Sequence, residues 1–254
     1  MKRVVLYLGV MLFSTVVYGQ MQVTLLQDAD NYSDWIGGEF RAVAGGTPDL
    51  SLAVDHSAYS ATTSGYLGDQ YYFQTFCIEF TEDFNPGSTY NVAISPNAMY
   101  GDQPPLGDPI SMGTAWLYSQ FAAGTLTGLT AGNVVTPYNY TLGSGRVSSA
   151  GELQQTIWWL EQEPDGIGDP GNSNPFRNAI LAEFGSAANA MVDANGAYGV
   201  MALNLGDPGL VQDQLVIVPG DNVVPEPTAA ALLVVGSILF LGARRGSALA
   251  VIRR

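Results

Sequence analysis

The chain has 254 residues, with nine basic and 23 acidic side chains and a formal net charge of −14. Six of the basic residues lie at the two ends, so the segment from 20 to 227 has three arginines, no lysine and a formal charge of about −20. Nucleic-acid binding needs a basic surface, so this composition excludes it. Hydrophobic residues make up 47% of the chain beside 30 glycines and 14 prolines, which favours a loop-rich globular domain over a disordered chain.

The first residues are typical of a secretory signal peptide. Lys2 and Arg3 precede an apolar run from 4 to 17, and Gly19 follows as a small residue before the cleavage point. We therefore expect residues 1–19 to be removed after Gly19. The alternative is an uncleaved anchor helix, although the run is shorter than the roughly 20 apolar residues that span a bilayer.

The first part of the body, which we place at residues 20–218, is typical of β-structure. Segments 22–27, 40–46 and 72–80 are rich in β-branched and aromatic residues, with glycines between them. An Asn-Pro-Gly-Ser turn at 85–88 leads into a further strand at 89–94. The incomplete alternation in 72–80 predicts an inner strand that is covered on both faces.

The middle of the body changes to helical spacing. A first helix is predicted to begin at Asp108–Pro109 and to end near Gly124. A capping box at Ser149–Glu152 predicts a second helix that ends before Pro164. Asn174–Pro175 supplies an N-cap and a first-turn proline for a third helix.

The body returns to strand-like sequence at 198–205 and 214–218. We therefore predict an α+β fold, a β-sheet or sandwich-like body with about three inserted helices. The first and last strands are expected to pair in one sheet, which would bring the ends of the body together.

Residues 219–227 form a predicted linker that contains the motif Val224, Pro225, Glu226 and Pro227. The prolines fix φ and remove amide donors, so a helix cannot begin before Pro227. Residues 228–245 are a predicted transmembrane helix, short but able to cross a thin bilayer, and 246–254 form a basic tail. Arg244 and Arg245 would lie on the cytoplasmic side.

This order of motif, apolar run and arginine pair resembles the PEP-CTERM sorting signal of Gram-negative bacteria. The resemblance implies export through the Sec translocon and an inner-membrane intermediate. It also implies processing by an exosortase-type membrane enzyme and a final place at the cell surface or in extracellular polysaccharide. The alternative is a plain C-terminal tail anchor. The tail at 246–254 departs from the pattern, because the chain is expected to stop sooner after Arg245.

Cys77 is the one cysteine of a chain with a predicted signal peptide. It therefore cannot form an internal disulfide, and an unpaired thiol in an oxidising compartment calls for an explanation. The segments Phe76–Glu79 and Leu153–Trp158 resemble the two signatures of the thioester domains of Gram-positive surface adhesins. The resemblance implies that the thiol of Cys77 condenses with the side chain of Gln154, with Gln155 as the alternative in register, and releases ammonia.

Such a thioester would capture an amine on a host or a neighbouring surface. Glu79 or Glu152 would help to move protons. A body without lysine offers no side-chain amine that would consume the bond internally. Thr156 stands where the family has alanine, and the alternative is a buried free cysteine on a strand.

Signatures of enzymes and cofactors are largely absent from the sequence, so we predict a non-enzymatic protein with no cofactor and no metal site. Asp55, His56 and Ser57 are adjacent, whereas the members of a hydrolytic triad converge from separate segments. Two Asp/Asn clusters without the spacing of a calcium loop are more typical of surface turns. They are Asp28, Asp30, Asn31 and Asp34, and Asp165, Asp169, Asn172 and Asn174.

A carbohydrate-binding or carbohydrate-active matrix protein is the alternative function. A pair of catalytic carboxylates leaves no local signature in a sequence. Aromatic side chains would line the sugar-binding face of such a protein. The tryptophans available for this role are Trp35, Trp116, Trp158 and Trp159.

Overall fold

The computed structural model describes residues 20–27, 33–34, 37–99, 107–130, 132–163, 168–206 and 211–220. The predicted signal peptide, the Pro-Glu-Pro motif and the predicted transmembrane helix lie outside these residues. Within the described part of the chain, no helix is both long and apolar enough to cross a membrane.

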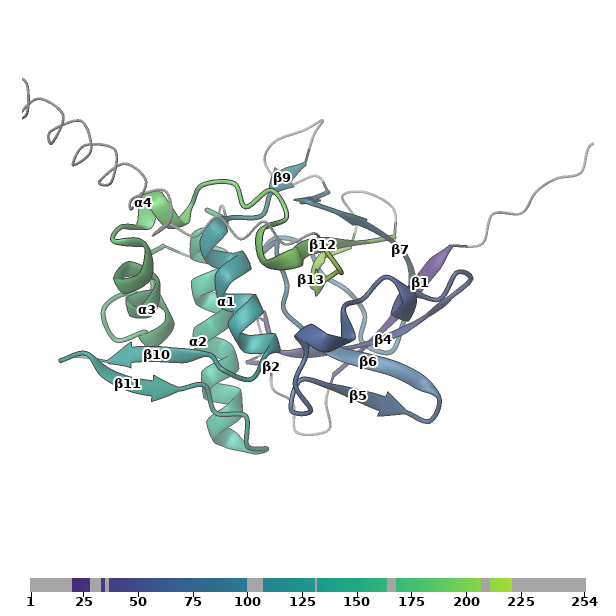
Figure 1. The fold of residues 1–254 in the computed structure, drawn as a ribbon, viewed down its shortest axis with the longest axis horizontal. Helices are drawn as coiled ribbons and strands as arrows, with labels where there is room; N and C mark the ends of the chain where they lie inside the picture. The colour runs from purple at the N-terminus through teal and green to yellow at the C-terminus, as the bar shows by residue number, and fades with distance from the viewer. Residues whose placement is uncertain are drawn as a thin grey trace, which may run out of the picture.

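The body is built on one antiparallel sheet of seven strands in the order β13-β12-β7-β1-β4-β6-β5 (Figure 1). The strands are β1 (Met21–Leu26), β4 (Phe40–Gly46), β5 (Ser64–Leu67), β6 (Gln70–Thr75), β7 (Thr89–Ser95), β12 (Val200–Leu205) and β13 (Gln214–Ile217). The predicted α+β class is confirmed, with a single large sheet and a few helices.

The sheet curls until its two sides meet. The first half of β6 pairs with β5, but the chain beyond β6 pairs with β13 through a backbone bridge between Cys77 and Gln214. The Thr75 hydroxyl also donates to the Leu215 carbonyl at 2.7 Å. Strands β13, β12, β7, β1, β4 and β6 thus form a barrel-like ring, which this bridge closes.

The helices gather on one side of the sheet (Figure 1). They are α1 (Met112–Ala122), α2 (Ser144–Leu160), α3 (Pro175–Phe184) and α4 (Ala187–Ala190), with 3-10 turns η1 (Leu50–Leu52), η2 (His56–Ala58) and η3 (Ala197–Gly199). Short strand pairs complete the fold: β2 (Ser33–Asp34) with β3 (Gly37–Gly38), β8 (Asn97–Ala98) with β9 (Asp108–Pro109), and β10 (Thr127–Thr130) with β11 (Val134–Pro137).

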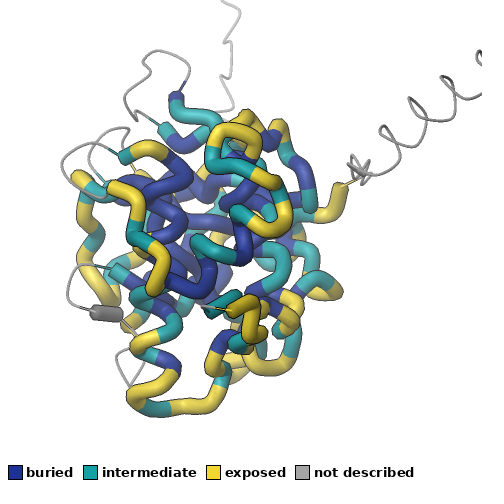
Figure 2. Tube along the Cα trace, turned by 90° about the vertical axis from the view of Figure 1, so that its left-hand side faces the viewer, coloured by how far each residue is buried: buried dark blue, intermediate teal, exposed yellow. Residues whose placement is uncertain are grey.

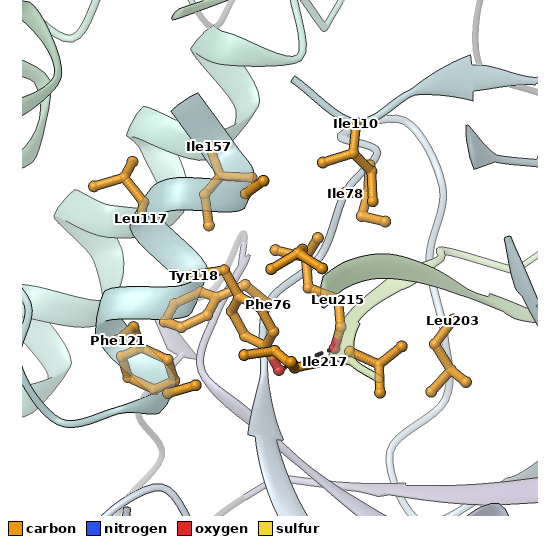
Figure 3. Close-up of a cluster of buried hydrophobic side chains, with 14 of the residues drawn as sticks. Phe76, Ile78, Ile110, Leu117, Tyr118, Phe121, Ile157, Leu203, Leu215 and Ile217 are labelled. Carbon is orange, nitrogen blue, oxygen red and sulfur yellow. Dashed lines mark hydrogen bonds between the residues drawn. The ribbon is translucent and has the colours of Figure 1, made fainter. Parts of the chain in front are cut away.

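Buried residues gather in the middle of the body (Figure 2), and the main core joins residues of the sheet to residues of α1 and α2. Figure 3 shows Phe76 near Tyr118 and Leu215, and Ile78 near Ile110, all of them fully buried. Side chains alternate along an extended chain, so Phe76 and Ile78 face this core while Cys77 faces the other way. Cys77 instead belongs to a second, smaller apolar cluster.

Two predicted helix starts were wrong. The first helix begins at Met112 behind the N-cap Ser111, because Asp108–Pro109 forms the short strand β9. The predicted capping box Ser149–Glu152 lies inside α2, which begins at Ser144. The end of α2 before Pro164 and the cap of α3 by Asn174 are confirmed.

Most predicted strands agree closely with the sheet, and β4 matches the predicted range 40–46. The strand predicted at 72–80 is shorter, because β6 ends at Thr75 and only an isolated bridge at Cys77 continues the pairing. The first and last strands lie in one sheet, but the prediction that they pair was wrong, because β7 and β12 separate them. The register also offsets Met21 from Ile217 along the strand direction. The ends of the body therefore share a sheet without lying side by side.

Candidate functional site

Cys77 and Gln214 face each other where the ring of strands closes. The Ile78 N–H donates to the Asp213 carbonyl at 3.0 Å, and the Leu215 N–H donates to the Phe76 carbonyl at 3.1 Å. These bonds flank Cys77 and Gln214, which makes them a non-hydrogen-bonded antiparallel pair. In such a pair the Cα atoms lie only about 4.5 Å apart and the side chains share one face.

The thiol and the carboxamide of this pair are in contact. Gln214 Nε2 lies 3.5 Å from Cys77 Sγ, and it also donates to the Gln212 carbonyl at 3.3 Å. Gln214 is 0% exposed and Cys77 is 1% exposed. The Oε1 atom of Gln214 is buried without a hydrogen-bond partner. It can therefore accept a hydrogen bond when negative charge develops on it during a reaction.

Gln154 approaches Cys77 from the opposite edge and binds its backbone. Gln154 Oε1 accepts from the Cys77 N–H at 3.1 Å, and Gln154 Nε2 donates to the Cys77 carbonyl at 2.8 Å. The N–H and the carbonyl of Cys77 point away from Gln214, because Cys77 and Gln214 form a non-hydrogen-bonded pair. Gln154 therefore takes the place of a neighbouring strand at this point and fixes the position of Cys77.

An apolar cluster seals the thiol from water. Buried Phe40 and Trp158 pack against Cys77, with Phe80 and Phe84 as partly buried neighbours. The Phe80 and Trp158 rings pack edge to face with their centroids 5.0 Å apart, and the Phe40 and Phe84 rings do the same at 4.7 Å. A side chain on Gly37 would collide with Trp158, so the glycine there allows the indole to lie close to the backbone.

Burial governs the electrostatics of the site. It raises the pKa of the Cys77 thiol far above its usual range, which the hydrogen bond from Gln214 opposes and the nearby Glu79 reinforces. The thiol is therefore protonated at neutral pH. Burial also raises the pKa of Glu79 well above its usual range and that of Asp213 to about 7.

A buried ion pair holds α2 against the sheet beside this site. Arg146 Nε donates to Glu39 Oε2 at 2.9 Å, and its Nη2 makes an ion pair with Glu39 Oε1. Tyr138 donates to Glu39 Oε2 at 2.9 Å, and Arg146 also binds the Tyr140 carbonyl at 2.8 Å. Glu39 is the residue before Phe40, and Arg146 lies on the same helix as Gln154, so this network joins α2 to the segment that carries Phe40.

The structure brings together the two predicted thioester residues, Cys77 and Gln154, but places the carboxamide of Gln154 on the backbone. Gln155 is exposed on α2 and Glu152 is partly exposed. Sequence reasoning missed Gln214. Its available signal was a glutamine at the start of the strand Gln214–Ile217, and only the pairing with Cys77 distinguishes it from other buried polar residues.

The other predicted groups do not converge. His56 Nε2 bonds the Ser51 carbonyl at 2.9 Å and its ring stacks on Tyr71 at 3.7 Å, while Asp55 binds Ser57. Within the described residues, no group of three or more His, Cys, Asp and Glu side chains is placed to hold a metal ion.

The two Asp/Asn clusters are described only in part. Asp169 and Asn172 bind Arg177, and Asn174 caps α3. Asp28, Asp30, Asn31 and Asp165 lie outside the described residues, and of Asp34 the backbone alone is described.

The tryptophans of the carbohydrate alternative pack into the body. Trp158 and Trp159 are buried, and Trp116 is partly buried against Phe184. Trp35 lies outside the described residues.

Comparison of the chain with protein-family models, with curated proteins and with solved structures gives no match. The chemistry of the site therefore has to be argued from its own geometry. The contact between the Cys77 thiol and the Gln214 carboxamide places a nucleophilic atom beside an acyl donor, while burial holds the thiol in its less reactive protonated form.

Proposed function

We propose that the body forms an internal thioester between Cys77 and Gln214 and that the protein acts as an exported, non-enzymatic surface adhesin. In the step that forms the bond, Cys77 Sγ attacks Gln214 Cδ. The S–Cδ bond forms, the Cδ–Nε2 bond breaks, and the thiol proton leaves with Nε2 as ammonia. Holding both groups in one geometry replaces a slow encounter between separate molecules.

The contact between Gln214 Nε2 and Cys77 Sγ carries this proposal. Two residues of a non-hydrogen-bonded pair need little movement to react, because their side chains already share a face. Gln154 as the acyl donor would have to give up both of its bonds to the Cys77 backbone. Its buried partners would then lack hydrogen bonds, which costs about 1–3 kcal/mol each.

The composition of the body favours an amine as the target of the thioester. A primary amine attacks Gln214 Cδ, the S–Cδ bond breaks, and the amine proton restores the Cys77 thiol. The segment from 20 to 227 has no lysine, so other copies offer no side-chain amine as competitors. A hydroxyl needs a general base for this attack. The chain's one histidine, His56, bonds the Ser51 carbonyl and stacks on Tyr71, so it does not serve as that base.

Intact mass measurement of the purified body tests the proposal. The wild type should be lighter than its sequence by one ammonia. Cys77→Ala and Gln214→Ala should each have the full mass expected from their sequences, and methylamine should convert the wild type to an amide with a free thiol. A wild type of full mass whose thiol is freely alkylated on unfolding contradicts the proposal.

The predicted sorting signal places this chemistry outside the cell. Export rests on the apolar run 4–17, and anchoring and processing rest on the motif at 224–227 with Arg244 and Arg245. Deleting residues 223–254 should release the body into the medium or leave it in the periplasm. Unchanged retention at the envelope would contradict the sorting role but would leave the thioester proposal intact.

A further inference from the structure

Two buried acidic side chains connect the segments that carry Cys77 and Gln214. Glu79 Oε2 accepts from the Asp213 N–H at 2.8 Å, and the Glu79 carbonyl accepts from Gln212 Nε2. Both contacts continue the backbone pairing one step beyond the bridge between Cys77 and Gln214. The Glu79 carboxyl thus serves as a link between the two segments.

The two carboxyls differ in their hydrogen bonds. Asp213 Oδ1 accepts from the Leu205 N–H at 2.8 Å, and Asp213 Oδ2 accepts from the Met99 N–H at 2.6 Å. Two backbone donors favour a charged Asp213. Glu79 Oε1 is buried without a hydrogen-bond partner, which is costly for a charged oxygen and favours a protonated Glu79.

The ionisable groups around Glu79 are acidic. Asp213 and Glu82 act on Glu79 directly, and both raise its pKa in addition to the effect of burial. The charge of Asp83 raises the pKa of the nearby Cys77 thiol. The Glu163 carboxylate accepts from the Phe80 N–H at 2.9 Å. Among the described residues that act on Glu79 and Cys77, none is a cation that compensates the pair, so the pair keeps one proton at neutral pH.

We propose that Glu79 is a positioning residue that keeps Cys77 against Gln214 only while the Glu79–Asp213 pair holds a proton. Loss of that proton leaves two buried negative charges on the two segments that must meet. Their repulsion and desolvation then separate the segments, because a buried charge without a partner is not tolerated. The thioester therefore forms at any pH at which the pair keeps a proton, and its formation is suppressed in alkaline surroundings. This proposal rests on the thioester proposed above.

Refolding at different pH values tests this inference. The full body is unfolded before the bond has formed, diluted into buffers from about pH 6 to about pH 9, and followed by intact mass for the loss of ammonia. Because burial and the nearby Asp213 raise the pKa of Glu79 well above its usual range, the pair loses its last proton only in alkaline buffer, where the wild type should form the bond roughly tenfold less readily. Ionisation of the thiol alone would change the rate in the opposite direction.

Two variants separate positioning from mere structure. Glu79→Gln stays neutral and can still accept from the Asp213 N–H, so it should form the thioester equally well at both pH values. Asp213→Asn should also lose the pH dependence. Asp83→Asn changes an exposed acid on the same segment and should keep the wild-type profile.

The outcomes distinguish the two proposals. A wild type that loses no ammonia even at the lower pH contradicts the thioester itself. A wild type that forms the bond equally at all pH values overturns the role of Glu79 and leaves the thioester standing. So does a wild-type pH profile retained by a folded Glu79→Gln or Asp213→Asn.

Discussion

The carboxamide of Gln154 pairs with the backbone of Cys77 as a neighbouring strand would, through bonds of 3.1 and 2.8 Å. Both residues are buried, and the pairing occupies the edge of Cys77 that Gln214 leaves free. Helix α2 and the strand bridge thus hold one residue from two sides. The thiol is placed by its backbone, and its side chain remains available for Gln214.

Replacing Gln154 should test this holding role. Gln154→Ala removes both partners of the Cys77 backbone, and we expect the free energy of unfolding to fall by about 2–4 kcal/mol. Urea denaturation measures the change. Gln155→Ala is the matched control, because Gln155 is exposed on the same helix and its loss should be nearly neutral. Equal stability of the two variants would contradict the role assigned to Gln154.

The buried ion pair between Arg146 and Glu39 should matter far more than the exposed one between Arg177 and Asp169. Arg146→Met leaves the Glu39 carboxylate buried without its cation, and we expect a loss of about 3–5 kcal/mol in the free energy of unfolding. Arg177→Met should cost about 0–1 kcal/mol, because water screens that pair. Thermal or urea unfolding of both variants measures the difference, and similar losses would count against this assignment.

Glu161 should make stability depend on pH. Its carboxyl binds the Ser111 hydroxyl at 2.8 Å at the start of α1, and burial raises its pKa to about 7 against the opposing hydrogen bonds of Thr114 and Ser111. The folded state keeps this proton where the unfolded chain has lost it. The stabilisation is therefore fully present below about pH 4 and is lost as the pH rises through about 7.

We expect the free energy of unfolding to fall with rising pH by up to about 1.4 kcal/mol per pH unit for this group. Urea titrations across that range, in a Cys77→Ala background that excludes the thioester, measure the slope. Glu161→Gln should reduce the slope, and the remaining slope belongs to groups such as Glu79 and Asp213, whose pKa values burial also raises. A slope that is unchanged in this variant would show that Glu161 is charged in the folded protein.

Asn174 should stabilise the contact between two helices as well as cap one. Its Oδ1 accepts from Phe176 and Arg177 N–H groups and from the Thr156 hydroxyl, and its Nδ2 donates to the Glu152 carbonyl. A lost N-cap alone costs about 0.5–2 kcal/mol, so Asn174→Ala should exceed that range.

Ser186→Ala is the comparison for Asn174→Ala, because Ser186 caps only the short α4 and its loss should stay within the range of a simple cap. Denaturant midpoints of both variants decide the point. Equal losses would mean that the bonds from Asn174 to α2 contribute little.

The sequence predicts those parts of the fold that local chemistry determines. The strand at 40–46 and the cap at Asn174 follow from residue preferences close in the chain. The start of α2 does not, because Ser144 and Gly145 are weak helix formers. That turn is held by tertiary contacts such as the one between Arg146 and Glu39.

The site was predictable only in part for the same reason. Cys77 and Gln154 stand out as a lone thiol and a glutamine in an apolar helix. The partner Gln214 lies 137 positions from Cys77, and the pairing that joins them is a property of the closed ring of strands. A distant pairing of this kind leaves no local periodicity to read.

The position of Gln214 determines where mechanical load would run after capture. A target amine joined to Gln214 would be attached to β13, only a few residues before the predicted linker that begins at 219. Tension between the target and an anchored C-terminus would then pass through that short stretch of chain and bypass the helices and most of the sheet. The bond could therefore bear force without unfolding the domain that made it.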